Sequence, residues 1–237
     1  MADKPMKRAE QIEIIYDKNQ WKVLQQLRLK AIQIMETLEN CHLRCIAHGS
    51  IARGDVSETS DIDLLLPDPP SSFVIETILE RSGFNGYQRT IIQATPLYAL
   101  KGYIELGQQS SLSFPLVKFR PVERNFYRFG GEALLSTLKE DKRVLGVDKR
   151  LMLIEPTMEG HIESAIVGRE KEVSNILGIS FNTVLDRVRA LLRRDAVGRT
   201  GVFIKRELAP DETFEHAMKK LADQNPAVRR RIRFFQK

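Results

Sequence analysis

Apolar residues recur at intervals of mostly three and four along residues 20–38, and neither proline nor glycine interrupts them. This periodicity predicts a helix with one buried stripe. Residues 71–81 repeat the helical spacing, with serines available to cap the first turn and a glycine just beyond the end. A second helix is therefore expected there.

Short apolar runs predict strands at residues 43–47 and 62–66, the second of which is followed by three prolines in four residues. Residues 87–119 are rich in β-branched and aromatic side chains, and we expect about three short strands there, separated at Gly102, Gly107 and Pro115. Strands that alternate with helices in this way indicate an α/β layer.

The segment from His48 to Leu64 has the composition of a reactive site. Gly49 lets the backbone approach an anionic group, and a short helix expected from Ser50 would direct its N–H groups to the same place. Asp61 and Asp63 are two positions apart on a predicted strand, so both side chains project from one face. Two carboxylates that close repel each other unless a divalent cation lies between them, and Mg²⁺ combines such carboxylates with substrate phosphates.

These residues resemble the signature of the DNA polymerase β-like nucleotidyltransferase superfamily: Gly49-Ser50, a ten-residue spacer, then Asp61-Ile62-Asp63 between hydrophobic residues. The resemblance implies an α/β (α+β) fold, a mixed sheet with flanking helices. It further implies that Gly49 and Ser50 hold the phosphates of a nucleoside triphosphate such as ATP. Asp61 and Asp63 would ligate two Mg²⁺ ions, for which Mn²⁺ can substitute.

Two further residues are candidates for this site. Arg53 follows Ser50 on the same short helix, where it either reaches a phosphate or pairs with Asp55 or Glu58. The superfamily also implies a third metal-binding carboxylate, and we assign it to Glu105, which lies between apolar residues on a predicted strand. The alternative is that Glu105 belongs to the solvent face of an amphipathic strand.

The chain has two cysteines, Cys41 and Cys45, which are close to two histidines. Zinc is a conceivable ligand, but Cys45 and His48 would face opposite sides of a strand and no second ligand pair is evident. We expect packed, inert cysteines. Two cysteines are also too few for a disulfide framework in 237 residues.

Charge is distributed unevenly along the chain. The net charge of +6 arises because residues 1–185 hold 23 basic and 24 acidic side chains, whereas residues 186–237 hold 14 and 7. Such a basic segment suggests an anionic partner, most often nucleic acid. The sequence has no apolar window of membrane-spanning length and no apolar segment of signal-peptide type, so we expect a cytoplasmic protein without a membrane partner.

The basic segment overlaps a pattern that resembles a winged helix-turn-helix domain. Residues 170–177 and 182–194 predict two helices around a turn at Gly178, and residues 195–206 predict a β-hairpin wing. The resemblance implies contact with DNA or RNA through the outer face of the second helix and the wing, including Asn182, Thr183, Arg187, Arg189, Arg193 and Arg199. Winged helices also serve as packing or dimerisation modules. The tail, residues 213–235, predicts one more helix.

These features predict two domains, a nucleotidyltransferase-like domain in residues 1–150 and a winged helix-turn-helix domain with a basic C-terminal helix in residues 151–237. The leading hypothesis is a Mg²⁺-dependent enzyme that transfers a nucleoside monophosphate from a nucleoside triphosphate to an acceptor hydroxyl. The alternative is a DNA-binding transcriptional regulator that senses nucleotides without catalysis. The acceptor and the oligomeric state are left open by the sequence.

Overall fold

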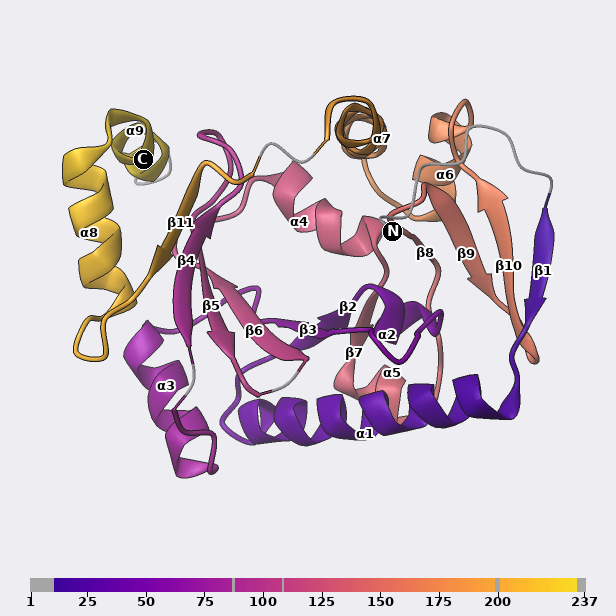
Figure 1. Cartoon of the computed structure of the whole chain (residues 1–237), viewed down its shortest axis with the longest axis horizontal. Coiled ribbons are helices and arrows are strands. Elements are labelled where there is room, and N and C mark those ends of the chain that lie inside the picture. The colour runs from indigo at the N-terminus through magenta and orange to yellow at the C-terminus, as the bar shows by residue number, and fades with distance from the viewer. Residues whose placement is uncertain (1–10, 87, 108, 199–200, 234–237) are drawn as a thin grey trace.

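Two β-sheets organise the chain in a computed structural model, which describes residues 11–86, 88–107, 109–198 and 201–233 (Figure 1). The larger sheet has the strand order β11-β4-β5-β6-β3-β2-β7. Its strands are β2 (Ile46–His48), β3 (Ile62–Leu65), β4 (Arg89–Gln93), β5 (Lys101–Glu105), β6 (Ser110–Pro115), β7 (Glu132–Leu134) and β11 (Ile204–Glu207). The smaller sheet has the order β1-β10-β9-β8, formed by β1 (Ile12–Ile15), β8 (Gly146–Val147), β9 (Met152–Pro156) and β10 (Gly160–Ala165).

The larger sheet is mixed, because β3 runs parallel to β6 whereas its other neighbouring strands pair antiparallel. Helices flank both sheets: α1 (Lys18–Glu39), α2 (Ser50–Arg53), α3 (Ser72–Arg81), α4 (Pro121–Phe129), α5 (Leu135–Lys139), α6 (Glu170–Ile176), α7 (Phe181–Val197), α8 (Phe214–Gln224) and α9 (Pro226–Arg233). The predicted fold class, a mixed sheet with flanking helices, is confirmed.

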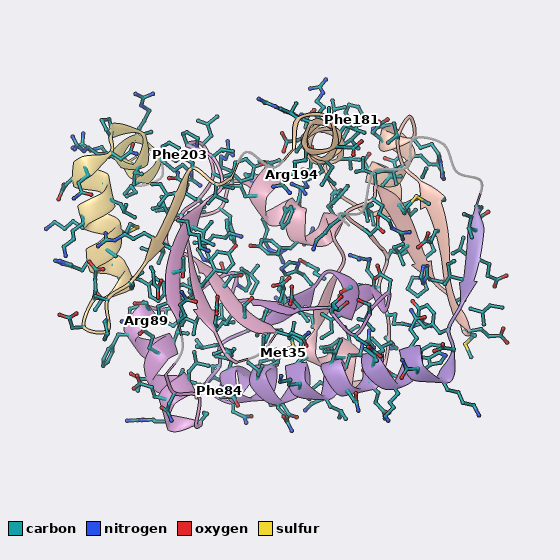
Figure 2. All side chains as sticks on the ribbon, viewed as in Figure 1. Met35, Phe84, Arg89, Phe181, Arg194 and Phe203 are labelled. Atoms are coloured by element: carbon teal, nitrogen blue, oxygen red, sulfur yellow. The ribbon has the colours of Figure 1, made fainter. Side chains whose placement is uncertain are left out.

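The long helix α1 lies along one face of the larger sheet (Figure 1). Asp17 caps it by accepting a hydrogen bond from the Gln20 backbone N–H at 2.7 Å. Most of the apolar stripe predicted from the sequence is buried against the sheet, and Met35 points into this layer (Figure 2), whereas Leu29 is exposed. With one sheet face buried by α1 and α3, the opposite face carries polar side chains and a small apolar cluster of Ile46, Leu65 and Tyr127.

A second apolar core lies between the smaller sheet and helices α6 and α7. The two helices meet at a turn where Gly178 has φ +60°, so the predicted helix-turn-helix arrangement is present. Phe129 of α4 belongs to this core, and α7 contacts α4. Helix α7 is therefore packed against α4, a helix that also covers the larger sheet.

The predicted wing is wrong. Helix α7 continues to Val197, and β11 pairs with β4 of the larger sheet instead of with a hairpin partner. The predicted hairpin turn includes Arg199, which lies outside the described residues. The predicted single tail helix is also wrong, because α8 ends before Asn225 and a new helix, α9, begins at Pro226. Proline is well suited to a first helical position and poorly suited to a helix interior.

The proposed division at residue 150 stays a prediction. Two strand pairings cross it, since β1 joins the smaller sheet beside β10 and β11 joins the larger sheet beside β4. No helix among the described residues is long and apolar enough to cross a membrane.

One glycine was expected to separate strands but lies inside one. Gly102 is part of β5, and a Cβ atom there would come within 2.6 Å of the Phe114 ring. Phe114 in turn packs edge-on against Phe214 of α8 at 5.0 Å between ring centroids. Glycine is needed at this position because it leaves room for the Phe114 ring against the strand. It does not mark a turn between strands.

Candidate active site

The motif aspartates come at the start of β3. Ile62 and Leu64 are buried in the main core, whereas Asp63 is partly exposed on the opposite face and Asp61, just before the strand, is exposed. This alternation follows from the two-residue period of a strand. The face of the sheet away from α1 therefore carries the carboxylates.

Strand register places Asp63 in a polar row that crosses the sheet. Asp63 is opposite Ser111 on one side and His48 on the other, and these are opposite Glu105 and Glu132 respectively. Residues in register on neighbouring strands project from the same face. We call Glu105, Ser111, Asp63, His48 and Glu132 the polar row.

Glu105 is not the immediate neighbour of Asp63 in this row. Ser111 lies between them, and its Oγ donates a hydrogen bond to Asp63 Oδ1 at 3.1 Å. Two strand spacings separate the backbones of Glu105 and Asp63, a distance of about 10 Å. Among the described residues, no three His, Cys, Asp or Glu side chains are placed together to hold a metal ion.

Asp61 and Asp63 nevertheless fit a magnesium ion that takes its other ligands from water and a bound nucleotide. Mg²⁺ is commonly held by one or two carboxylates together with substrate phosphate oxygens. The chain supplies the two carboxylates on one accessible face. The role of Glu105 as a third ligand stays a prediction.

The Gly49-Ser50 turn comes directly after His48 of the polar row, at the end of β2. Gly49 has φ +80°, a conformation that disfavours residues with a Cβ atom, and it caps the single turn of α2. Its N–H donates to the Gly131 carbonyl at 3.0 Å, which anchors the turn to the start of β7. Ser50 is partly exposed. Their phosphate-binding role stays a prediction.

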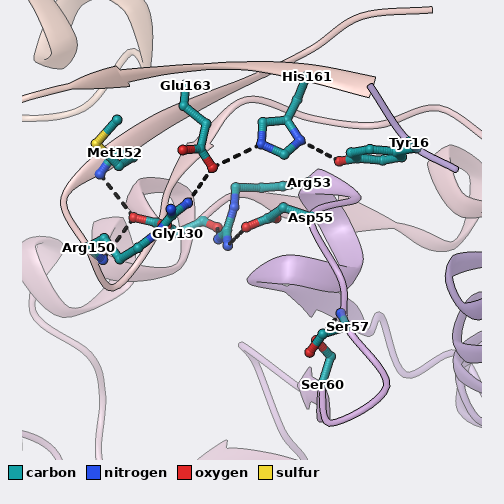
Figure 3. Close-up of polar contacts among 11 residues, drawn as sticks. Tyr16, Arg53, Asp55, Ser57, Ser60, Gly130, Arg150, Met152, His161 and Glu163 are labelled. Carbon is teal, nitrogen blue, oxygen red and sulfur yellow. Dashed lines mark hydrogen bonds and ion pairs between the residues drawn. The ribbon is translucent and has the colours of Figure 1, made fainter. Parts of the chain in front are cut away.

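Arg53 takes the ion-pair alternative that the sequence left open. Its Nη2 atom lies 2.7 Å from Asp55 Oδ2 and its Nη1 donates to the Gly130 carbonyl at 2.5 Å (Figure 3). The side chain is buried, with a relative exposure of 5%. Arg53 thus ties α2 to the loop before β7, and its nucleotide contact stays a prediction.

A buried polar network lies beside this loop, and sequence reasoning missed it (Figure 3). Tyr16 and His161 Nδ1 are hydrogen-bonded at 2.6 Å, and His161 Nε2 lies 3.1 Å from Glu163. Glu163 also pairs with Arg150, which reaches Asp148 at 2.6 Å. The two-residue spacing of His161 and Glu163 was the available signal, because it puts both on one face of β10.

The pKa values in this network reflect its burial. Burial and the nearby Asp55 carboxylate raise the pKa of Tyr16 to about 12. Burial alone would raise the pKa of Glu163, but the bonds from Arg150 and His161 bring it below its ordinary value. Glu163 is therefore ionised and paired in the folded protein.

Aromatic side chains from α4 cover part of the polar row. The His48 ring packs edge-on against Tyr127 at 4.9 Å and Phe126 at 6.3 Å between centroids. Burial lowers the pKa of His48 to about 4, against an opposing effect of Asp63. Lys101 Nζ lies 3.2 Å from the Tyr127 hydroxyl and 4.9 Å from the Tyr103 ring centroid.

Comparison with known families identifies the segment that contains this site. Residues 28–124 match the nucleotidyltransferase domain family. The match includes the Gly49-Ser50 turn, both motif aspartates and Glu105, and it spans 97 of the 237 residues. No curated protein and no solved structure matches the chain.

The nucleotidyltransferase match ends within α4, so it does not extend to the residues predicted to contact nucleic acid. On α7, Asn182, Arg189 and Arg193 are exposed as expected. The predicted outer-face position is wrong for Thr183, which is 1% exposed, and for Arg187, whose guanidinium lies over the Phe126 ring at 4.7 Å. Both side chains are on the buried side of α7 because they lie one helical turn apart beside its apolar stripe.

The cysteine prediction is correct for one residue. Cys45, the residue before β2, is buried, and burial raises the pKa of its thiol. Cys41 is exposed, contrary to the expected packing.

Proposed function

We propose that this chain is a Mg²⁺-dependent nucleotidyltransferase that transfers a nucleoside monophosphate from a nucleoside triphosphate to an acceptor hydroxyl. The observation that carries the proposal is the position of Asp63 on the polar face of β3 and of Asp61 just before that strand, one strand from the Gly49-Ser50 turn. The family match to residues 28–124 supports the same chemistry.

In this proposal each part of the site has a separate task. Asp61 and Asp63 hold Mg²⁺, which when bound neutralises charge on the phosphates during transfer. Gly49 and Ser50 receive the β- and γ-phosphates. The acceptor oxygen attacks the α-phosphorus and its proton passes to water, the bond from the α-phosphorus to the bridging oxygen breaks, and pyrophosphate leaves with that electron pair.

Transfer of labelled nucleotide tests the proposal directly. The full chain is incubated with α-labelled nucleoside triphosphates, Mg²⁺ or Mn²⁺, and nucleic-acid, protein and small-molecule acceptors. Asp61→Asn combined with Asp63→Asn should lower transfer by about a thousandfold or more, because both metal-binding carboxylates are lost. Transfer that survives the double substitution would refute the assignment.

Asp68 provides a matched control. It is an exposed aspartate just after β3, and Asp68→Asn removes the same charge from the same region without altering the polar face of the strand. We expect transfer by this variant to match the unaltered chain. An equal loss in Asp68→Asn and the double variant would mean that charge in general, and not the two motif carboxylates, supports activity.

A second candidate function is nucleotide sensing without turnover, as part of a DNA-binding transcriptional regulator. The observation that favours it is the serine between Asp63 and Glu105, which leaves the third carboxylate two strands away. This candidate predicts that ATP binds in the presence of Mg²⁺ and is recovered intact with every acceptor. Turnover that depends on Asp61 and Asp63 would exclude it.

The exposed side of α7 supports a nucleic-acid partner for either function. Asn182, Arg189 and Arg193 are exposed there, and the two arginines lie within the basic last 52 residues. Phosphate contacts release counterions, so the affinity for DNA or RNA should fall steeply with salt. Replacing Arg189 and Arg193 by methionine should weaken binding and reduce that salt dependence by about one counterion per lost contact.

A further inference from the structure

Lys101 is a cation on the polar face of the sheet without an acidic partner. It lies on β5, four residues before Glu105, so both side chains project from the same face. Its Nζ contacts the Tyr127 hydroxyl and the Tyr103 and Tyr127 rings, and it forms no ion pair with any described residue. Burial alone lowers the pKa of Lys101, but the two tyrosines more than offset this effect, so the ammonium stays charged.

Arg187 is a second cation in the same situation. It comes from α7, and its guanidinium lies over the Phe126 ring. Its Nε is buried without a hydrogen-bond partner, and the described residues provide no ion pair for it. Burial lowers the pKa of Arg187, although an arginine remains protonated under all ordinary conditions.

A shared aromatic group joins the two cations. Phe126 and Tyr127 are adjacent on α4, with ring centroids 5.2 Å apart, and both pack against His48 of the polar row. His48 is in register with Asp63. Lys101 and Arg187 thus contact the aromatic pair that packs against His48, although the two residues are 86 positions apart in sequence.

An unpaired cation in a partly desolvated place costs free energy, which an anionic ligand would recover. Aromatic faces stabilise the two charges only in part. Lysine and arginine together are the usual ligands of phosphate, because they offer several charged N–H donors. A carboxylate has two oxygen atoms to accept hydrogen bonds, which are fewer than the N–H donors of a lysine and an arginine together. A phosphate group therefore fits the two cations better.

We propose that Lys101 and Arg187 form a phosphate-binding site over the Phe126–Tyr127 pair, beside His48 of the polar row. The site takes the phosphates of the nucleoside triphosphate or a phosphate of the acceptor. The choice between these two sources rests on the proposed nucleotidyltransferase function, whereas the existence of the site does not. Helix α7 then has two roles, with Arg187 facing inward to a substrate phosphate and Arg189 and Arg193 facing solvent.

Inorganic tripolyphosphate is the first probe, titrated into the full metal-free chain by calorimetry. Lys101→Met and Arg187→Met should each weaken binding by about tenfold or more, because each removes charge-assisted hydrogen bonds to phosphate. Lys101→Arg should retain most of the affinity. The matched controls are Lys219→Met on α8 and Arg81→Met at the end of α3, both exposed, which should bind like the unaltered chain.

Two further titrations distinguish the source of the phosphate. ATP is compared with adenosine, and a 5′-phosphorylated oligonucleotide is compared with the same oligonucleotide lacking the phosphate. If the methionine variants weaken only ATP, the site holds the nucleotide. If they weaken only the phosphorylated oligonucleotide, it holds the acceptor.

Unchanged tripolyphosphate affinity in both methionine variants would overturn the proposal, as would the absence of tripolyphosphate binding to the unaltered chain. A loss of equal size in the control variants would overturn it too. The melting temperature of each variant verifies folding, and Lys101→Gln and Arg187→Gln replace any methionine variant that melts early. Because these readouts need no turnover, the site can be supported even if no transfer is ever detected, and it can fail while transfer succeeds.

Discussion

Arg53 and Lys101 both act electrostatically on His48, and Arg187 lies over the Phe126 ring that packs against His48; these cations form two groups that differ in how they are paired. Arg53 is matched by the Asp55 carboxylate and the Gly130 carbonyl. Lys101 and Arg187 contact aromatic rings and a hydroxyl group, and the described residues offer them no carboxylate. The paired cation holds structure together, whereas the unpaired ones retain charge for a ligand.

The comparison has a thermodynamic consequence that can be measured. Removing one member of a buried ion pair leaves the other charge uncompensated, which is strongly destabilising. Removing a partly buried cation that has no counter-ion also removes its desolvation cost, so the net change in stability is small. Stability and ligand binding should therefore respond in opposite ways to substitutions in the two groups.

The largest expected effect on stability is that of Arg53→Met. The Asp55 side chain, which is only 12% exposed, loses its ion-pair partner, and the Gly130 carbonyl loses a hydrogen-bond donor. We expect the free energy of unfolding to fall by about 3 kcal/mol. Urea denaturation followed by circular dichroism measures this change. A loss below that of an exposed substitution such as Arg81→Met would mean that Arg53 is not a structural anchor.

Glu163→Gln should have the next largest effect, and one that depends on pH. Because the folded-state pKa of Glu163 is lowered, its contribution is fully present above its unfolded-state pKa and is lost as the pH falls through the folded-state value. At pH 7 the variant should lose about 1–3 kcal/mol, since Arg150 and His161 lose a charged acceptor. The difference between the two proteins should shrink below about pH 4.3. Unfolding curves from pH 3 to pH 7 measure it, and a constant difference would contradict the argument.

Local sequence patterns predicted the motif because all its parts lie within 16 residues, from His48 to Asp63. A strand, a glycine turn and a second strand are determined there by alternation and backbone conformation. The same local patterns located α1, α3, α6 and α7 to within a few residues. Local signals were sufficient for elements whose buried face repeats with a fixed period.

Strand partners were not predictable in this way. Residues 204–207 have the composition of a wing strand, but they pair with β4, more than 100 residues earlier. Ser111 and Glu132 join Asp63 and His48 only through sheet order. The positions of Thr183 and Arg187 had a local signal, since they flank the apolar stripe of α7, but the charge of Arg187 suggested solvent. The Phe126 ring, over which its guanidinium lies, accounts for the inward position.

Arg187→Met and Lys101→Met test whether the two cations without a carboxylate partner contribute to stability. Each should change the free energy of unfolding by less than about 1 kcal/mol, because the lost cation–π contact and the relieved desolvation oppose each other. The same urea denaturation measures both variants beside Arg53→Met. A loss as large as that of Arg53→Met would mean that the two cations are structural, and it would remove the basis for a ligand site at Phe126 and Tyr127.

The smallest effect on stability is expected for Arg189→Met combined with Arg193→Met. Both side chains are exposed on α7, so their replacement should change the free energy of unfolding by about 0.5 kcal/mol or less. Nucleic-acid binding should weaken in low salt and converge with that of the unaltered chain as salt increases, because screening removes the contribution of exposed charges first. Fluorescence anisotropy across a salt series measures this convergence. A deficit that persists at high salt would indicate that α7 contacts bases as well as phosphates, since hydrogen bonds to base edges are not screened in this way.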